Sequence, residues 1–240
     1  MKKNIIIIGG SGLIGSSICK ELNLKGYNVI NLDLKRNNSV EFNFKLDVNN
    51  YKKINLLVNK IFKQFQRIDG AVVVYYPKRV KTKKFISQNI KSIILNIENH
   101  ITGYLNINQV LCKNFLKQKK GHIINFSSMY GAILPRKEIY KKTEIQATPL
   151  DYILSKSLIN KFTKYMSEEF KKNNIRFNLI SPGGIYDDHS KKFVKNYTRF
   201  THSDKMLDPT CIAKLTEFLL NENSKFISSQ NIVIDDGFSI

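Results

Sequence analysis

Tyr152 and Lys156, four positions apart, are the pair in this 240-residue sequence best suited to moving a proton. That spacing places both side chains on one face of a predicted helix. An ammonium group near a phenol favours the phenolate, so Lys156 is expected to lower the pKa of Tyr152 from about 10 towards neutrality. Tyr152 could then serve as a general acid or base near pH 7. Taken alone, the Tyr-x-x-x-Lys pattern also fits a solvated pair in a lysine-rich chain.

A glycine-rich segment, Gly9-Gly10-Ser11-Gly12-Leu13-Ile14-Gly15, lies between the first predicted strand and the first predicted helix. Glycine permits a tight turn and close approach of the backbone to a pyrophosphate. The helix N-terminus adds free N–H groups and a partial positive charge. This context predicts a dinucleotide-binding loop, and an ordinary glycine turn is the alternative.

An acidic residue, Asp33, ends the second predicted strand, 18 residues after Gly15. A carboxylate at this distance is placed to bind the two hydroxyls of an adenosine ribose and to repel a 2′-phosphate, which favours NAD over NADP. Lys35 and Arg36 follow directly and could accept that phosphate, so NADP stays open. Asp47 and Val48, after the third predicted strand, could contact the adenine edge, although an exposed acidic strand end is the alternative.

The elements that must position these residues alternate along the chain. Apolar runs predict strands at 3–8, 28–32, 42–46, 70–75, 122–126, 175–180 and 231–234, and helical spacing predicts helices at 13–24, 51–65, 85–116, 151–170 and 209–220, the long one with a possible break midway. Such alternation predicts a single α/β domain over residues 1–240. We expect a Rossmann-like, doubly wound parallel sheet of about seven strands with helices on both faces. Its ligand site should lie at the carboxyl ends of the strands.

Six segments resemble the short-chain dehydrogenase/reductase family, in that family's order and over nearly the whole chain. They are Gly9 to Gly15, Asp47-Val48, Asn125 to Gly131, Tyr152 to Lys156, Arg176 to Gly184 and Asn231 to Gly237. The resemblance implies hydride transfer between NAD(P)(H) and a substrate carbon. It implies that Ser128 polarises the carbonyl group, that Tyr152 passes the proton, and that Lys156 holds the nicotinamide ribose. The Pro182-Gly183 turn would lie beside the nicotinamide.

The resemblance also assigns a cofactor-binding set. It consists of Gly9, Ser11, Gly12, Leu13, Ile14, Gly15, Asp33, Asp47, Val48, Tyr152, Lys156, Pro182, Gly183 and Ile185. The sequence departs from the family in two places. Val73-Val74-Tyr75-Tyr76-Pro77 stands where Asn-Asn-Ala-Gly is usual, and His100 stands where a catalytic helix asparagine is usual. His100 could relay a proton through water, or it could be an ordinary buried histidine.

A further feature is the separation of 24 residues between Ser128 and Tyr152, which is longer than in many family members. The added segment, residues 132–149, is called the insertion below. With Tyr76-Pro77, His100 and Asp235-Asp236-Gly237, it resembles a branch of reductases found with bacterial flagellin-glycan and surface-polysaccharide sugar pathways. Residues 185–207 are predicted to form a variable substrate loop. Its basic and aromatic residues, with those of the insertion, could bind an anionic or nucleotide-linked sugar, or could form a solvated lid.

The net charge of +20 leaves other interpretations open. It comes from 39 basic residues, 33 of them lysine, against 19 acidic residues. A polyanion-binding surface would explain it, but lysines spread along the whole chain favour compositional drift, so nucleic acid binding is a competing and less favoured function. A cofactor-binding protein with reduced catalysis, acting as a regulator or partner subunit, is another competitor.

The remaining expectations concern the setting of the protein. Three cysteines without a secretion signal or a membrane-length apolar run predict a cytoplasmic protein with no membrane contact. Four scattered histidines and no Cys/His cluster at ligand spacing give no support for a metal site. The family resemblance also implies self-association through the long helices, as a homodimer or homotetramer.

Overall fold

Seven parallel strands form the centre of the structure, a computed structural model that describes residues 2–80 and 85–240. The strands are β1 (Asn4–Ile8), β2 (Asn28–Asp33), β3 (Phe42–Lys45), β4 (Gly70–Val73), β5 (Gly121–Phe126), β6 (Ile175–Pro182) and β7 (Asn231–Ile234). Their order in the sheet is β3-β2-β1-β4-β5-β6-β7, and every pairing is parallel. The predicted doubly wound α/β fold is therefore confirmed.

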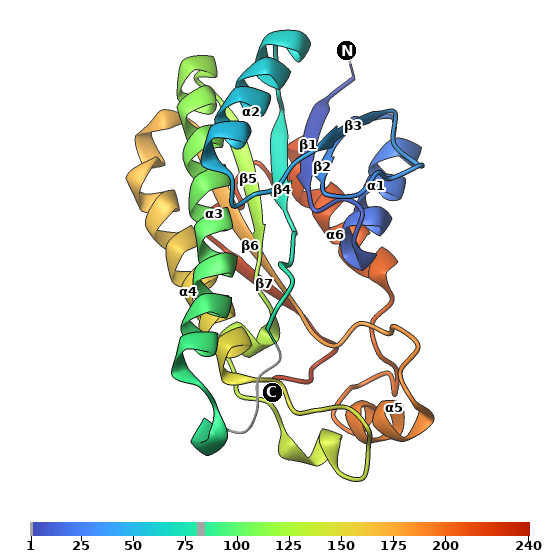
Figure 1. Ribbon diagram of the computed structural model, residues 1–240. Helices are drawn as coiled ribbons and strands as arrows, with labels where there is room; N and C mark the ends of the chain where they lie inside the picture. The colour runs from blue at the N-terminus through green and yellow to red at the C-terminus, as the bar shows by residue number, and fades with distance from the viewer. Residues whose placement is uncertain (1, 81–84) are drawn as a thin grey trace.

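Helices cover both faces of this sheet (Figure 1). Helices α1 (Leu13–Leu24) and α6 (Pro209–Leu220) pack on one face, and α2 (Tyr51–Phe65), α3 (Ile90–Gln118) and α4 (Leu150–Glu169) pack on the other. Side chains alternate along a strand, so β1 serves both cores: Ile5 and Ile7 join the α1–α6 core, whereas Ile6 and Ile8 join the α2–α4 core. This two-sided burial explains why β1 is a continuous apolar run.

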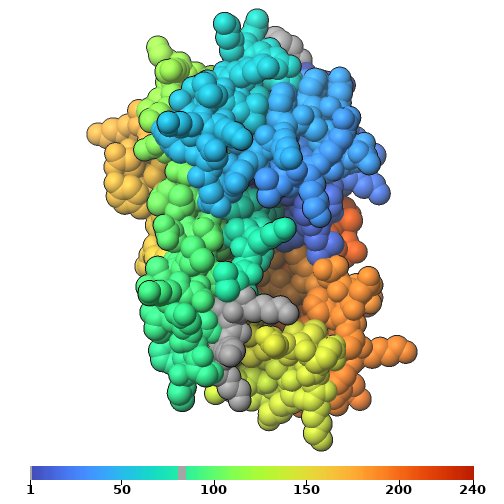
Figure 2. All heavy atoms as spheres, in the orientation of Figure 1, coloured from blue at the N-terminus to red at the C-terminus, as the bar shows by residue number. Residues whose placement is uncertain are grey.

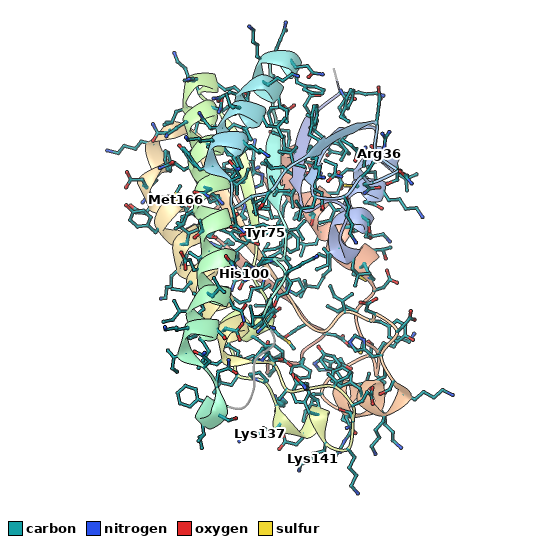
Figure 3. All side chains as sticks on the ribbon, in the orientation of Figure 1. Arg36, Tyr75, His100, Lys137, Lys141 and Met166 are labelled. Carbon is teal, nitrogen blue, oxygen red and sulfur yellow. The ribbon has the colours of Figure 1, made fainter. Side chains whose placement is uncertain are left out.

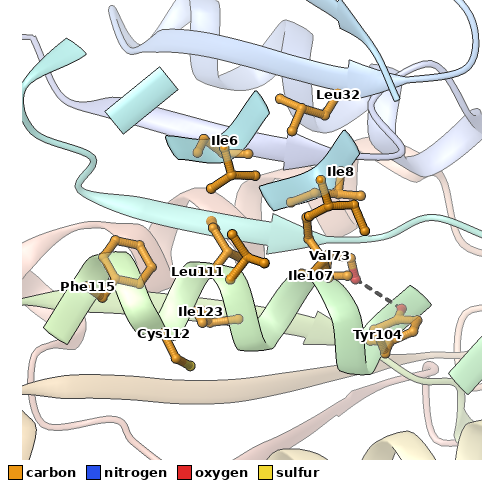
Figure 4. Close-up of a cluster of buried hydrophobic side chains, with 14 of the residues drawn as sticks. Ile6, Ile8, Leu32, Val73, Tyr104, Ile107, Leu111, Cys112, Phe115 and Ile123 are labelled. Atoms are coloured by element: carbon orange, nitrogen blue, oxygen red, sulfur yellow. Dashed lines mark hydrogen bonds between the residues drawn. The ribbon is translucent and has the colours of Figure 1, made fainter. Parts of the chain in front are cut away.

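The α2–α4 core lies directly behind the site described below. Figure 4 shows apolar side chains of α3 packed against β1, β4 and β5. Tyr104 is fully buried in this core, and its hydroxyl donates hydrogen bonds to the carbonyl oxygens of Val73 and Phe126 at 3.0 and 2.8 Å. Val73 ends β4 and Phe126 ends β5, so Tyr104 fixes the carboxyl ends of two adjacent strands to α3.

Two elements differ from the sequence-based prediction. The long helix α3 runs without a break from Ile90 to Gln118, and the predicted start at residue 85 is instead a short 3₁₀ turn, Phe85–Ser87. The segment 185–207, predicted as a loop, contains an eight-residue helix, α5 (Lys191–Thr198). Its Ser190 N-cap accepts a hydrogen bond from the backbone N–H of Phe193, and Phe193 and Tyr197 turn one face inward.

The strand order creates the place where a ligand can bind. From β1 the chain runs to β2 and β3 on one side, then crosses to β4 on the other side of β1. The connections leave β1 and β4 in opposite directions, which opens a crevice at their carboxyl ends. Within the described residues, no helix combines the length and apolar character needed to cross a membrane.

Candidate active site

A cavity of about 950 Å³ opens at the carboxyl ends of the strands. Figure 2 shows the surface hollowed there, between the teal segment after β4, the yellow-green insertion and the orange segment that contains α5. The cavity is lined by all fourteen residues of the expected cofactor set and by Ser128. The structure therefore brings the glycine-rich loop and the Ser-Tyr-Lys group, which are far apart in sequence, into one site.

The glycine-rich loop at one end of this cavity has the geometry that a pyrophosphate requires. Gly9 has φ +91°, and a Cβ there would lie 2.5 Å from the Cα of Tyr75, so only glycine fits. Gly12 is the N-cap of α1 and makes no side-chain cap, and a Cβ on it would meet little besides the carbonyl oxygen of Gly9 at 3.6 Å. The free N–H groups of the first turn of α1 thus adjoin open space, which fits an anionic diphosphate.

Asp33 lies beside the loop, where its carboxylate is fixed by backbone groups. Oδ2 accepts a hydrogen bond from the N–H of Ser11 at 3.0 Å, and Oδ1 accepts one from the N–H of Lys35 at 3.0 Å. The Ser11 hydroxyl in turn donates to the carbonyl oxygen of Lys35 at 2.8 Å. Lys35 lines the cavity, but Arg36 does not and extends outward near β3 (Figure 3). Of the two residues that could accept a 2′-phosphate, only Lys35 is therefore in position.

Ser128 and Tyr152 meet at the other end of the cavity. Burial raises the pKa of Tyr152 above its usual value, and the nearby Ser128 side chain opposes this only in part. The neighbouring Ser127 has a structural role, because its hydroxyl donates to the carbonyl oxygen of Lys156 at 2.8 Å and so binds β5 to α4. Ser128 is thus the serine available to a substrate in the cavity, whereas Ser127 helps to hold α4 against β5.

Lys156 is buried beside this pair, with only 5% of its surface exposed. Its Nζ donates one hydrogen bond, to the carbonyl oxygen of Phe126 at 3.4 Å, and lies 5.7 Å from the centre of the Tyr152 ring. Burial lowers the pKa of Lys156 from 10.5 to about 7. This differs from the sequence-based expectation, in which a charged Lys156 lowers the pKa of Tyr152. Desolvation dominates both groups and favours their neutral forms.

His100 is placed differently from its expected role in the site. It does not line the cavity, it is 2% exposed, and its ring packs among the rings of Tyr75, Tyr76 and Tyr104. Burial lowers its pKa to about 2, so the imidazole is neutral, and among residues 2–80 and 85–240 its Nε2 has no hydrogen-bond partner. The buried-histidine alternative matches this geometry, and the adjacent Asn99 is the α3 residue that lines the cavity.

The insertion and α5 form the outer wall of the cavity as one packed unit. The amide of Asn196 in α5 donates to the carbonyl oxygens of Ile139 and Lys141 at 3.2 and 3.0 Å. The rings of Tyr140 and Phe193 lie 6.0 Å apart, and both residues line the cavity. The insertion is therefore packed against the segment 185–207 and hydrogen-bonded to it.

The basic residues of this wall are turned away from the cavity. None of Arg136, Lys137, Lys141, Lys142, Lys191, Lys192, Lys195 and Arg199 lines it. Figure 3 shows Lys137 and Lys141 at the outer end of the insertion. Arg136 instead lies over the ring of Phe200, 4.7 Å from its centre, and donates to the carbonyl oxygens of Phe238 and Ile240. These residues hold the wall together or face solvent, and they do not form the expected clamp for an anionic sugar.

Aromatic side chains surround the reacting end. Tyr76, Tyr130, Tyr140, Phe193 and Tyr197 line it, with Gln146, Thr148 and His189 as polar members. The sequence suggested substrate binding by the aromatic residues of the insertion and of residues 185–207, and Tyr140, Phe193 and Tyr197 do line the cavity. The signal for Tyr76 was its place after the fourth strand, where the family motif is broken. No group of three or more His, Cys, Asp or Glu side chains in residues 2–80 and 85–240 is arranged to hold a metal ion.

Comparisons with known proteins agree with this geometry. A family model described as Enoyl-(Acyl carrier protein) reductase matches residues 11–239. The post-translational flagellin modification protein A of Campylobacter coli is 31% identical, over 99% of this chain and 98% of that protein. The acetoacetyl-CoA reductase of an Acinetobacter species is 24% identical, over 98% of this chain and 97% of that protein.

Solved structures give the same result. The crystal structure of a short-chain dehydrogenase from Leptospira borgpetersenii with bound NAD+ has a TM-score of 0.89 and 27% sequence identity, and the match covers 100% of this chain and 94% of that one. The similarity therefore extends over nearly the whole chain, including the segments that form the glycine-rich loop and the Ser128–Tyr152–Lys156 group. The chain belongs to the short-chain dehydrogenase/reductase family of NAD(P)-dependent oxidoreductases.

Proposed function

We propose that this enzyme interconverts an alcohol and a carbonyl group on a sugar-derived substrate of a surface-glycan pathway, with NAD(H) as its preferred cofactor. The observation that carries the proposal is that Ser128, Tyr152 and Lys156 line one cavity together with the glycine-rich loop, with Nζ of Lys156 5.7 Å from the centre of the Tyr152 ring. This intact group favours an active enzyme over a regulator with reduced catalysis.

The side chains have separate roles in this reaction. When bound, the nicotinamide supplies a hydride to the substrate carbon or accepts one from it. Ser128 donates a hydrogen bond to the substrate oxygen and orients it, and the Tyr152 hydroxyl gives that oxygen a proton during reduction. In the oxidative direction Tyr152 takes the proton back. Because the pKa of Tyr152 is raised, the residue is protonated at neutral pH and ready to act as an acid.

The preference for NAD(H) rests on Asp33. Its carboxylate is fixed by two backbone N–H groups and lines the cavity next to the loop, where it would accept hydrogen bonds from ribose hydroxyls and repel a 2′-phosphate. We expect wild-type protein to bind NADH more tightly than NADPH. We expect Asp33→Ala to weaken NADH binding at least about tenfold, because hydrogen bonds to a charged group are lost. The same change should improve NADPH binding.

A fluorescence titration with both reduced cofactors measures these affinities. Arg36→Ala is the matched control, since Arg36 lies outside the cavity and should leave both affinities unchanged. Lys35→Ala should weaken NADPH binding to the Asp33→Ala variant, since Lys35 is the cation in position to meet a 2′-phosphate. An unchanged cofactor preference in Asp33→Ala would show that Asp33 does not contact the ribose.

The substrate class is supported by two observations. The flagellin modification protein matches this chain over nearly its full length, and the reacting end of the cavity presents aromatic rings with neutral amide and hydroxyl groups. Aromatic faces pack against the C–H faces of a sugar ring, while amides and hydroxyls meet its hydroxyl groups. We expect turnover of keto sugars, free or nucleotide-linked, in preference to small diketones and β-ketoacyl thioesters.

Oxidation of NADH, followed by absorbance with each of these three carbonyl classes, tests the proposal. Tyr152→Phe removes one hydroxyl and should reduce kcat at least about a hundredfold while cofactor binding is retained. Turnover confined to β-ketoacyl thioesters would contradict the sugar substrate. Full turnover in Tyr152→Phe would contradict the assignment of the proton donor.

A further inference from the structure

The segment after β4 places an aromatic ring over the lysine of the active site. The centre of the Tyr76 ring lies 5.7 Å from Nζ of Lys156 and 5.7 Å from the centre of the Tyr152 ring. Nζ is also 5.7 Å from the Tyr152 ring centre, so the amine lies at the same distance from both rings. Nζ also donates a hydrogen bond to the carbonyl oxygen of Phe126, so this oxygen and the two rings border the amine.

An ion pair holds Tyr76 in this position. The guanidinium group of Arg79 binds Oδ2 of Asp151 through Nε, at 3.0 Å, and through Nη2. Asp151 is 1% exposed and directly precedes Tyr152 in α4. Burial raises the pKa of Tyr76 above its usual value, and the nearby charge of Arg79 opposes this. The pair therefore fixes the Tyr76 segment to the first turn of the helix that carries Tyr152 and Lys156.

A second attachment fixes the same segment to α3. The side chain of Asn96 accepts a hydrogen bond from the N–H of Val80 at 2.9 Å and donates one to its carbonyl oxygen at 3.0 Å. Behind Tyr76, the ring of His100 contacts the Tyr76 ring edge-on at 5.1 Å. Tyr76 is thus supported from α3 and α4, although 48% of its own surface is exposed.

We propose that Tyr76 is a positioning residue of this active site: its ring, held by the Arg79–Asp151 ion pair, covers the Lys156 amine, keeps water from it and fixes it beside Tyr152. The role deepens the proposed oxidoreductase function and rests on it. A lysine enclosed between two rings has few orientations, whereas an uncovered lysine on its flexible stem would be solvated and mobile.

The groups around Lys156 predict the direction of the effect of removing the ring. The rings of Tyr152 and Tyr76 border the amine, and the Tyr104 hydroxyl shares the carbonyl oxygen of Phe126 with it. The neutral His100 and the Arg79–Asp151 ion pair lie nearby, and Ser128 and Tyr130 line the same cavity. Burial is the cause of the lowered pKa of Lys156, about 7. Attraction between the ammonium and one ring acts in the opposite sense and is worth about 1.5 pKa units, which is smaller than the lowering from 10.5 to about 7 that burial causes. Admitting water should therefore raise this pKa.

The test measures the pKa of Lys156 directly and needs no substrate. The rate of acylation of Lys156 by acetic anhydride is followed against pH, by mass spectrometry of its peptide. We expect Tyr76→Ala to raise the pKa of Lys156 by about one unit or more. Tyr76→Phe and Tyr76→Leu both keep an apolar cover and should hold it near the wild-type value. Tyr165→Ala is the matched control, because Tyr165 is an exposed tyrosine of the same helix, at 65%.

Each outcome decides the proposal. An unchanged pKa of Lys156 in folded Tyr76→Ala would overturn it, and so would a rise in Tyr76→Leu as large as that in Tyr76→Ala. A rise in Tyr76→Ala alone supports it. Where turnover is found, the pH profile of kcat should shift in the same direction. A shifted Lys156 pKa in a protein that turns over no carbonyl would uphold the role of Tyr76 as cover and contradict the proposed function.

Discussion

At the residue scale, the site is defined by the burial of groups that would carry charge in water. Burial raises the pKa of Tyr152 and lowers that of Lys156 to about 7, so both side chains are held towards their neutral forms. Such an arrangement is unfavourable for folding, because the lysine loses the solvation that its ammonium group has in the unfolded chain. Stability therefore gives no reason for this pair, which favours the catalytic role proposed for it.

This cost gives a prediction for Lys156→Met. Methionine has a similar length and no charge, and the carbonyl oxygen of Phe126 keeps its hydrogen bond from Tyr104. The folded pKa of Lys156 lies below the unfolded value, so the unfolded chain binds more protons between about pH 7 and pH 10.5, and wild-type stability rises with pH there. The variant should therefore be more stable than wild type by roughly 1–3 kcal/mol at pH 7, with a gain that shrinks towards pH 10.

Urea unfolding of both proteins at several pH values measures that difference. Lys161→Met is the control, since Lys161 is an exposed residue of the same helix and should change the stability little at any pH. The Lys156→Met variant should also lack turnover. A stability gain that stays constant from pH 7 to pH 10 would contradict the lowered pKa of Lys156.

Only some residues of the site can be recognised from the sequence. Gly9 to Gly15 and the Tyr152–Lys156 pair are recognisable because their chemistry depends on local spacing. Arg79 and Asp151 are 72 positions apart, so nothing local indicates that they form an ion pair. His100 was recognisable as unusual, but its orientation depends on how α3 rotates against Tyr75 and Tyr76. The sequence alone therefore does not predict side-chain contacts between segments that are far apart in the chain.

At the scale of elements, apolar runs predicted the strands well because a doubly wound sheet buries both faces of its central strands. The ends of β7 and α6 were predicted as the structure has them, and those of β2 and β6 were one and two residues short. A break in α3 was wrong, because tertiary contacts of Tyr104 and Ile107 continue the buried face through that region. Helix α5 was missed, since its four-residue spacing of Phe193 and Tyr197 stands among exposed lysines.

The insertion and α5 show why loops are harder to interpret than strands. Their basic residues suggested binding of an anionic substrate, yet the structure directs the charges outward and the aromatic rings inward. A mixed segment packs its rings against the core and leaves its charges in water, whatever it binds. Composition alone could not show which of these side chains face the cavity, whereas the structure places Tyr140 and Phe193 in its lining.

At the scale of the whole molecule, the charge of +20 is not concentrated in the active site. Of the lysines in the described residues, Lys35, Lys78 and Lys156 line the cavity. Within the part of the chain that the structure describes, the ion pairs of lysine are those of Lys3 and Lys120 with Glu222 and of Lys171 with Glu168, and of these side chains Lys3 is half-buried and the others are exposed. Charge distributed in this way maintains solubility and does not define a binding face. The compositional explanation accounts for it, and the oxidoreductase function requires no polyanion partner.

The exposed apolar residues of the molecule are less evenly distributed, and they predict self-association. Leu105 and Leu116 of α3 and Leu154 and Leu158 of α4 are between 39 and 46% exposed, on two helices that pack side by side. We expect these helices to pair with those of a second copy, giving a dimer or tetramer by light scattering. Leu105→Lys combined with Leu158→Lys should shift the mass to that of a monomer, because two charges cannot be buried unpaired. Leu24→Lys, which changes a leucine 73% exposed on α1, should leave the mass unchanged. A monomeric wild type would contradict the assignment of this surface.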